Sequence, residues 1–435
     1  MENEGHHQIG VIEAISIGIG GMVGGGIFAV LGLAVQLGEG GTPIAFLLAG
    51  IVAILTAYSY NRLSVTHLTQ GGTAAFLIEG LGPGLFSGTL NILLLLSYIV
   101  MLSLYSYAFG SYGATFFPPE QQLIWKHALT IVAITALMVL NFFKANIIGR
   151  VENLIVVAKV AILIFFVGIG LFTINPSSMA PSTWNDSLSL ISAGFIIFVA
   201  YEGFELIANT SQDLRDPKRN LPRAYFTAVI VVITLYVLVA VVTVGNLPIN
   251  QIVAAEDYAL AEASKPFLGQ SGFLLIVIGA LLSTASSINA TLYGTTRFSH
   301  LINQFGELPP FPQKDIKSLH IDGGLVVTCV ITLIFANFFD LQNISTMGSA
   351  GFLLIFAAVN WSNYRLRKKT NSRGFISVLG TVACLAAFVA LIMETTITQP
   401  IDIAVLAVML GISWSIAFTY KQIAEKKKSN RNSRK

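Results

Sequence analysis

A single lysine stands inside an apolar run that is long enough to cross a bilayer. Lys159 lies in the stretch LIVVAKVAILIFF, residues 154–166, and residues 154–172 carry no other charge. An ammonium group at mid-depth costs about 2.5–3.5 kcal/mol on insertion scales. Two interpretations stay open. The long stem can carry the ammonium group to the interface, or the group is kept inside the protein, where it can release a proton.

A group of glycines lies in the first apolar run. The stretch ISIGIGGMVGGGIF, residues 15–28, holds glycine at positions 18, 20, 21, 24, 25 and 26. Each interior glycine costs about 1 kcal/mol of helix propensity relative to alanine, so the GGG run favours unwinding. Unwound backbone is tolerated in a bilayer where it lines a cavity or is otherwise paired. Close helix packing through small residues is the alternative.

Two carboxyl groups lie in the sixth apolar run, FIIFVAYEGFELIANT, residues 195–210. Glu202 and Glu205 flank Gly203 and follow Tyr201. Two carboxylates at mid-depth cannot both remain ionised without a counter-charge. The Glu202 side chain either selects a cationic partner or is protonated and hydrogen-bonded, so that it tunes coupling without touching a substrate.

The first and sixth runs are the first of each half of a five-plus-five arrangement. Interrupted helices at matching positions of two halves indicate a midplane binding site in a secondary transporter. The N–H groups after such a break suit a carboxylate, and the carbonyl groups before it suit an ammonium group. Together they fit an α-amino acid.

The amino-acid composition indicates that these motifs belong to a membrane protein. The chain has 435 residues, 54% of them hydrophobic and 11% charged, whereas soluble domains carry about 25% charged residues. A span needs about 20 apolar residues. This length predicts twelve spans, near 11–35, 42–61, 86–117, 123–143, 151–174, 187–209, 224–246, 270–296, 323–339, 345–364, 375–393 and 401–420.

The basic residues predict the orientation. With a cytoplasmic N-terminus, all of the 25 lysines and arginines except Lys126, Lys159 and Lys265 fall in or beside cytoplasmic segments, as the positive-inside rule requires. Both termini are therefore expected in the cytoplasm and the chain in the plasma membrane. The N-terminus has no basic region typical of a signal peptide. The basic tail, 421–435, is either a disordered topogenic segment or a lipid or partner signal.

Enzyme signatures are missing from the sequence. The six histidines lie in termini, loops or span ends, and neither H-E-x-x-H nor G-x-S-x-G occurs. Cys329 and Cys384 lie in apolar runs, as buried small hydrophobic residues do. We expect no enzyme, no metal site and no cofactor. A channel or a nutrient sensor on a transporter scaffold stays open.

Five motifs resemble the permeases of the amino acid–polyamine–organocation (APC) superfamily. They are GGMVGGGIF, VAYEGFE, DLRDPKRNLPRA, SSINATLYGTTR and GELPPF. The loop GNLPINQI and the segment LIVVAKVAIL are most similar to the ApcT-type, proton-coupled amino-acid transporters.

The resemblance implies a single all-α transporter domain of about 12 transmembrane helices. It divides the chain into a first five-helix repeat, 11–174, a second inverted repeat, 187–364, two additional helices, 375–420, and the basic tail. Helices 1 and 6 would be discontinuous. The implied function is secondary active transport of amino acids, as proton symport by alternating access. An exchanger or a carrier of polyamines or cationic amino acids is the alternative.

The resemblance also implies the site residues and partners. The substrate would lie against Met22, Gly24, Gly25, Gly26, Ile27, Val199, Ala200 and Glu202. Proton coupling would use Lys159 in the place of a sodium ion, next to Gly20, Ser286 and Ser287, and gating would use Phe198, Tyr201 and Glu205. The expected partners are an amino acid, protons and membrane lipid, with no nucleic acid. Neither the substrate nor the oligomeric state follows from the sequence.

Overall fold

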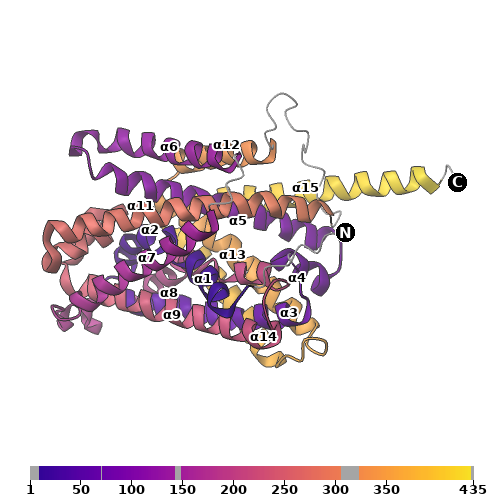
Figure 1. Ribbon diagram of the computed structural model, residues 1–435, viewed down its shortest axis with the longest axis horizontal. Coiled ribbons are helices and arrows are strands. Elements are labelled where there is room, and N and C mark those ends of the chain that lie inside the picture. Colours follow the sequence, from indigo (N-terminus) through magenta and orange to yellow (C-terminus); the bar gives the residue numbers. More distant parts are fainter. Residues whose placement is uncertain (1–8, 70, 143–147, 305–322, 433–435) are drawn as a thin grey trace.

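The computed structural model describes residues 9–69, 71–142, 148–304 and 323–432, and helices make up its framework (Figure 1). The longer helices are α1 (Val11–Met22), α2 (Gly25–Gly38), α3 (Thr42–Thr66), α4 (Gly72–Leu81), α5 (Leu85–Ala114), α6 (Gln122–Phe142), α7 (Ile148–Gly170), α8 (Ser187–Ile196), α9 (Pro217–Asn246), α10 (Ile249–Ala255), α11 (Ala259–Gln304), α12 (Gly323–Phe338), α13 (Leu341–Arg365), α14 (Gly374–Thr398) and α15 (Pro400–Asn432). Short 3-10 segments join them, among them η4 (Ile197–Tyr201), η5 (Phe204–Thr210) and η6 (Glu256–Tyr258). The all-α membrane fold is confirmed.

Most of the predicted spans are present. Within the described ranges, ten helices are long and apolar enough to cross a membrane, and the bent pair α1–α2 makes an eleventh span. The remaining predicted span, 323–339, corresponds to α12, whose 16 residues reach about 24 Å. Large apolar side chains on the outer helices remain exposed, such as Leu123 on α6 and Leu154 on α7, which suits contact with lipid rather than water.

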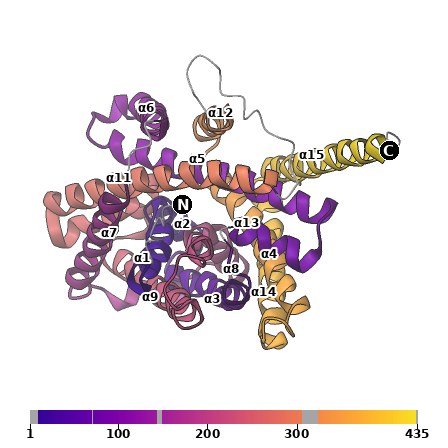
Figure 2. The same cartoon turned by 45° about the vertical axis from the view of Figure 1, so that its right-hand side comes forward.

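Helix α5 lies at the centre of the bundle. It packs against α6, α11, α13 and α15, while α3 packs against α9 and α14 against α13. Helices α6 and α12 lie together on one side of the bundle, and α15 extends away from it at the C-terminal end (Figures 1 and 2). The basic tail is therefore a continuation of α15 up to Asn432 rather than a disordered segment; residues 433–435 lie outside the described residues.

The first span is broken, as predicted. Helix α1 ends at Met22, α2 begins at Gly25, and the two axes differ by 42°. The unwound part is shorter than the GGG run, because Gly25 and Gly26 belong to the first turn of α2. A Cβ atom on Gly26 would lie 2.8 Å from Cα of Ala200. The glycines thus serve both the break and close packing.

The sixth span is broken at the glutamate–glycine pair. Helix α8 tightens into η4, Glu202 is extended, and Gly203 has a φ of +120° before η5 begins. A Cβ atom on Gly203 would lie 2.3 Å from the carbonyl carbon of Gly21, and one on Gly21 would lie 2.8 Å from the carbonyl oxygen of Gly203. The two breaks therefore meet backbone against backbone.

This contact predicts that alanine at position 203 destabilises the protein strongly. The substitution combines a strained positive φ with an overlap on Gly21, so we expect a loss of about 2–4 kcal/mol and an apparent Tm in detergent lower by several degrees. The control is Gly168→Ala in α7, where a Cβ atom meets nothing within 4 Å. Equal melting temperatures of the two variants would contradict a tight contact between the breaks.

Candidate functional site

A cavity lies beside the contact between the two breaks. Its volume is ≈ 180 Å³, and α1, α4, α5, α7, α11 and η5 contribute to its wall. On α1 it extends from Ser16 to Gly21, so it follows the half of the first span that precedes the break. Hydroxyl groups line much of it, on Ser16, Thr73, Tyr98, Tyr105, Ser287 and Thr291. Of the described residues in the wall, Glu202 is the one with a carboxyl group. The volume suits a small polar solute, since pockets for larger ligands run from about 300 Å³.

Lys159 is buried against the first span. Its side chain is 1% exposed, and its Nζ donates a hydrogen bond of 2.8 Å to the carbonyl of Gly20. The lysine therefore points into the protein and does not reach the interface. The contact with Gly20 is the one that the resemblance implies, and it joins α7 to the last turn of α1 before the break.

The serines expected near Lys159 lie on α11. Ser287 lines the cavity and donates to the carbonyl of Ser283, while Ser286 is nearly buried at 5% exposure. Ser283 was not predicted: its hydroxyl lies 3.0 Å and 2.9 Å from the carbonyl oxygens of Val23 and Gly24. It holds the unwound segment, and its place four residues before Ser287, on the same helix face, is the signal that could have found it.

Three carbonyl groups at the breaks, those of Met22, Val199 and Ala200, accept hydrogen bonds within the protein. The Tyr236 hydroxyl lies 2.6 Å from the carbonyl oxygen of Met22 and 3.2 Å from that of Ala200. The carbonyl of Val199 accepts from the N–H of Glu202 at 3.3 Å. Tyr236, on α9, was missed because nothing in the α9 sequence links this tyrosine to the breaks.

Side chains also pack tightly against the glycines of the first break. A Cβ atom on Gly25 would lie 2.4 Å from the Tyr105 ring, and one on Gly24 would lie 2.4 Å from Oγ of Ser287. Gly24, Gly25, Gly26 and Ile27 are buried and do not line the cavity. Their role in substrate binding stays a prediction.

The two glutamates are both buried but make different contacts. Glu202 lines the cavity, and its Oε2 accepts from the Tyr105 hydroxyl at 3.2 Å. Glu205 is 1% exposed, and its Oε2 accepts from the N–H of Gly203 at 2.8 Å. Glu205 therefore stabilises the backbone of the break, while Glu202 faces the space beside it.

The predicted gating aromatics do not reach the cavity. Phe198 is fully buried and packs edge-on against Phe356, with ring centroids 5.9 Å apart. Tyr201 is fully buried too, and its hydroxyl donates to the carbonyl of Phe46 at 2.8 Å. Both residues belong to η4, and their rings pack into the protein core. A gating role for them stays a prediction.

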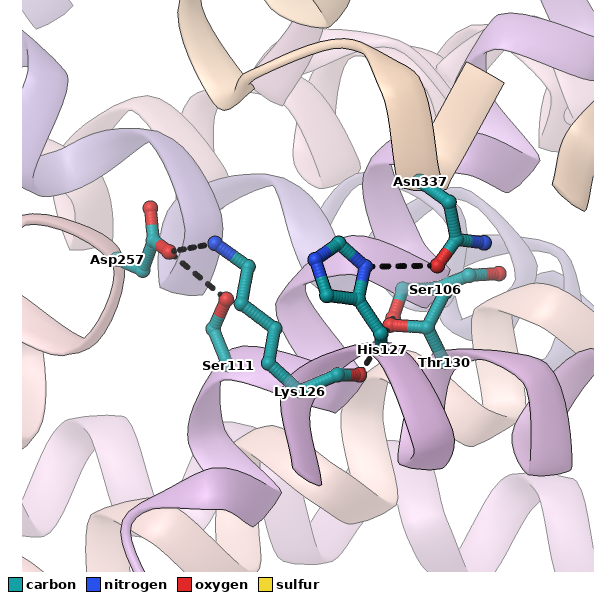
Figure 3. A network of polar contacts seen from close by, with 7 residues as sticks. All are labelled: Ser106, Ser111, Lys126, His127, Thr130, Asp257 and Asn337. Atoms are coloured by element: carbon teal, nitrogen blue, oxygen red, sulfur yellow. Dashed lines mark hydrogen bonds and ion pairs between the residues drawn. The ribbon is translucent and has the colours of Figure 1, made fainter. Parts of the chain in front are cut away.

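A second polar network lies farther along α5 (Figure 3). The ammonium group of Lys126, on α6, lies 2.8 Å from Oδ2 of Asp257, in η6, and 3.7 Å from the centre of the Tyr107 ring. The Ser111 hydroxyl donates to the same carboxylate oxygen. Since η6 also packs on α2, this network ties α5 and α6 to the segment beside the second half of the first span.

Comparison with known proteins decides the family. The chain matches the amino acid permease family over residues 9–418. The chain belongs to this family. The permease is 35% identical to the inner membrane transport protein YbaT of Escherichia coli over 393 residues, which cover 90% of this chain and 91% of that one.

Two further relatives are less informative about function, because one has no assigned function and the other is less similar in sequence. The permease is 34% identical to an uncharacterized protein of Methanocaldococcus jannaschii, with 97% of each chain covered. It is 24% identical to the branched-chain amino acid permease BcaP of Bacillus subtilis, with 69% of this chain and 68% of that one covered. The permease is thus an integral membrane transporter of amino acids and not an enzyme.

The Lys126 network predicts a stability difference between two lysines. Lys126→Met removes the cation that faces the Asp257 carboxylate, whose side chain is only 12% exposed. We therefore expect the free energy of unfolding to fall by about 1–3 kcal/mol. The control is Lys265→Met, which removes the more exposed Lys265–Glu262 pair and should cost about 0–1 kcal/mol. Thermal unfolding in detergent measures both, and a smaller loss for Lys126→Met than for the control would contradict this assignment.

Proposed function

We propose that the permease is a proton-coupled amino-acid symporter in which Lys159 takes the place that a sodium ion has in related transporters. The observation that carries the proposal is the buried hydrogen bond from Lys159 Nζ to the Gly20 carbonyl. An ammonium group placed there supplies a positive charge between α7 and α1 without a metal ion. It also supplies a group that can release a proton.

The protonation state of Lys159 would control how firmly the two helices are held together. A charged lysine donates three hydrogen bonds, whereas a neutral amine donates two and lacks the charge that strengthens them. Gly20 immediately precedes Gly21, which contacts the second break. Deprotonation therefore loosens α1 close to the point where it meets η5.

Alternating access would move the two halves of the chain about this contact. We assign residues 11–174 and 187–364 to two inverted five-helix repeats, because a broken helix begins each of them and the breaks meet at Gly21 and Gly203. With cytoplasmic termini in the plasma membrane, the cavity along α1, the first half of the broken first span, would lie on the cytoplasmic side. The structure would then correspond to an inward-facing state.

An exchanger or a carrier of cationic amino acids or polyamines is the second candidate. The carboxyl group of Glu202 in the cavity wall favours a cationic substrate, since a carboxyl group that is ionised by such a partner attracts it. An exchanger would be identified by uptake that requires an amino acid on the opposite side of the membrane and does not depend on the proton gradient.

The test is uptake into proteoliposomes with and without an imposed pH gradient, in sodium-free buffer. We expect the parent protein to accumulate amino acid when the outside is acidic. Lys159→Met, which roughly keeps the volume of the stem, should only equilibrate the amino acid. Lys265→Met, at a partly exposed lysine distant in sequence from the breaks, is the control. Accumulation by Lys159→Met equal to that of the parent would contradict a coupling role.

A further inference from the structure

A basic patch lies where the ends of α3, α13 and α14 pack together. Arg62, near the end of α3, belongs to it. The loop between α13 and α14 adds five cations in nine residues and no acidic residue: Arg365, Arg367, Lys368, Lys369 and Arg373. We propose that this basic patch binds the headgroup phosphate of an anionic membrane lipid. The proposal depends neither on the transported substrate nor on the coupling ion.

The cations of the basic patch have no carboxylate partner in the part of the chain that the structure describes. They take part in none of its ion pairs. Helix α4 packs on α13, and its Glu79 is exposed but pairs with none of them. The five loop cations are all exposed. Like charges this close in sequence repel one another, so an anion bound among them would stabilise the loop.

Tyr58 links Arg62 to the loop. The Arg62 Cζ atom lies 5.5 Å from the centre of the Tyr58 ring, and the Tyr58 hydroxyl accepts a hydrogen bond of 2.7 Å from the N–H of Arg373. The hydroxyl therefore still has its own hydrogen atom to donate. The Nε atom of Arg62 is buried and has no hydrogen-bond partner in the structure. A buried donor without a partner is costly, and a phosphate oxygen would satisfy it.

A second guanidinium group is already oriented. Arg367 lies over the Tyr364 ring, with Cζ 4.6 Å from its centre, and its Nη1 donates to the Tyr364 carbonyl at 3.2 Å. Backbone hydrogen bonds close the loop itself, among them one of 2.8 Å from the N–H of Lys369 to the carbonyl of Leu366. A guanidinium group that is held in place loses little freedom on binding, and its planar fork matches the oxygens of a phosphate.

Arg373 lies at the start of a helix, where a cation is unfavourable. It is the N-cap residue of α14, and its side chain makes no cap hydrogen bond. The N-terminal end of a helix carries a partial positive charge, which favours an anion. The positive-inside rule accounts for a basic loop at this face. It does not account for a cation at a helix start beside a buried, unpaired donor of Arg62.

The apolar side chains beside the basic patch indicate that the anion is a lipid. Trp361, near the end of α13, is 43% exposed, and Phe375, in the first turn of α14, is 77% exposed. Trp361 stacks on Tyr364, with ring centroids 5.1 Å apart. Exposed tryptophan and tyrosine are typical of the membrane–water interface. A ligand with a phosphate and acyl chains would contact both parts of this surface.

The orientation expected from the basic residues supplies such a lipid. With a cytoplasmic N-terminus, the basic patch faces the cytoplasmic leaflet, whose anionic lipids attract basic segments next to a span. A phosphate between Arg62 and Arg373 would join α3 to the start of α14. Because a ligand that binds the folded protein stabilises it, the lipid would strengthen the packing of α3 against α13 and α14.

The test compares two lipids that have equal acyl chains and differ in headgroup charge. Native mass spectrometry of the purified permease, titrated with phosphatidylglycerol or with phosphatidylcholine, measures the affinity for each. We expect the parent protein to bind phosphatidylglycerol at least about tenfold more tightly. The double variant Arg62→Gln/Arg373→Gln should bind phosphatidylglycerol about 10- to 100-fold more weakly, because charge-assisted hydrogen bonds are lost. Its affinity for phosphatidylcholine should change by less than about threefold.

The matched control is Lys218→Gln/Arg219→Gln, which removes two exposed cations from the first turn of α9. It should bind both lipids as the parent protein does. Arg62→Lys/Arg373→Lys keeps both charges without the planar forks, and should weaken phosphatidylglycerol binding about 3- to 10-fold. If the double glutamine variant is not monodisperse, Arg373→Gln alone, at an exposed position, should still lose at least about threefold.

Four results would overturn the proposal. Equal affinity of the parent protein for the two lipids means that the cations serve topology only. An equal loss in the control and in Arg62→Gln/Arg373→Gln means that overall charge attracts the lipid. Full affinity in Arg62→Lys/Arg373→Lys means that no oriented site exists. Displacement of phosphatidylglycerol by an equal concentration of inorganic phosphate means that the ligand is a soluble anion.

Discussion

Unwound backbone inside a membrane must find its hydrogen-bond partners within the protein, and this constraint governs the centre of the molecule. Water is not available in the hydrocarbon core, and each unpaired N–H or carbonyl group there costs several kcal/mol. The two breaks are therefore surrounded by side chains that satisfy them. The Ser283 hydroxyl lies within hydrogen-bond distance of the carbonyl oxygens of Val23 and Gly24. The Glu205 carboxyl group accepts from the N–H of Gly203, and Lys159 donates to the carbonyl of Gly20.

Much of this arrangement could be predicted from the sequence, because its signals are local. Apolar runs give the spans, and glycines mark the first break. The pair Glu202 and Glu205 around Gly203 marks the second break. Lys159 stands out as a lysine inside a charge-free run, for which the residues left burial and a reach to the interface open, and the structure shows burial. Each signal depends on residues that are neighbours in the chain.

The rest depends on contacts between segments far apart in the chain, which no local pattern records. The sequence pattern of α9 does not show that the Tyr236 hydroxyl reaches Met22 and Ala200. Nor does a GGG run show that Gly25 and Gly26 continue as helix, since their fit against Tyr105 and Ala200 decides it. The cavity lies beside the last two turns of α1, before Gly24, Gly25 and Gly26, which were expected to bind substrate.

The three lysines that depart from the positive-inside pattern share a property. Lys159 bonds a backbone carbonyl, and Lys126 and Lys265 each pair with a carboxylate, Asp257 and Glu262. The charges of Lys126 and Lys265 are therefore balanced by a carboxylate, while the Lys159 ammonium group is held inside the protein by a hydrogen bond. A lysine that contradicts a charge rule in a membrane sequence is thus a good place to look for a specific contact.

The Tyr236 hydroxyl has a consequence for hydration. It carries one hydrogen atom and faces two carbonyl oxygens, so it satisfies both only while α1 and η4 stay together. When these segments separate, one carbonyl loses its donor, and water is the donor at hand. Separation of α1 from η4 at this point therefore carries a hydration demand, because water entering between them can replace the hydrogen bond that Tyr236 gives up.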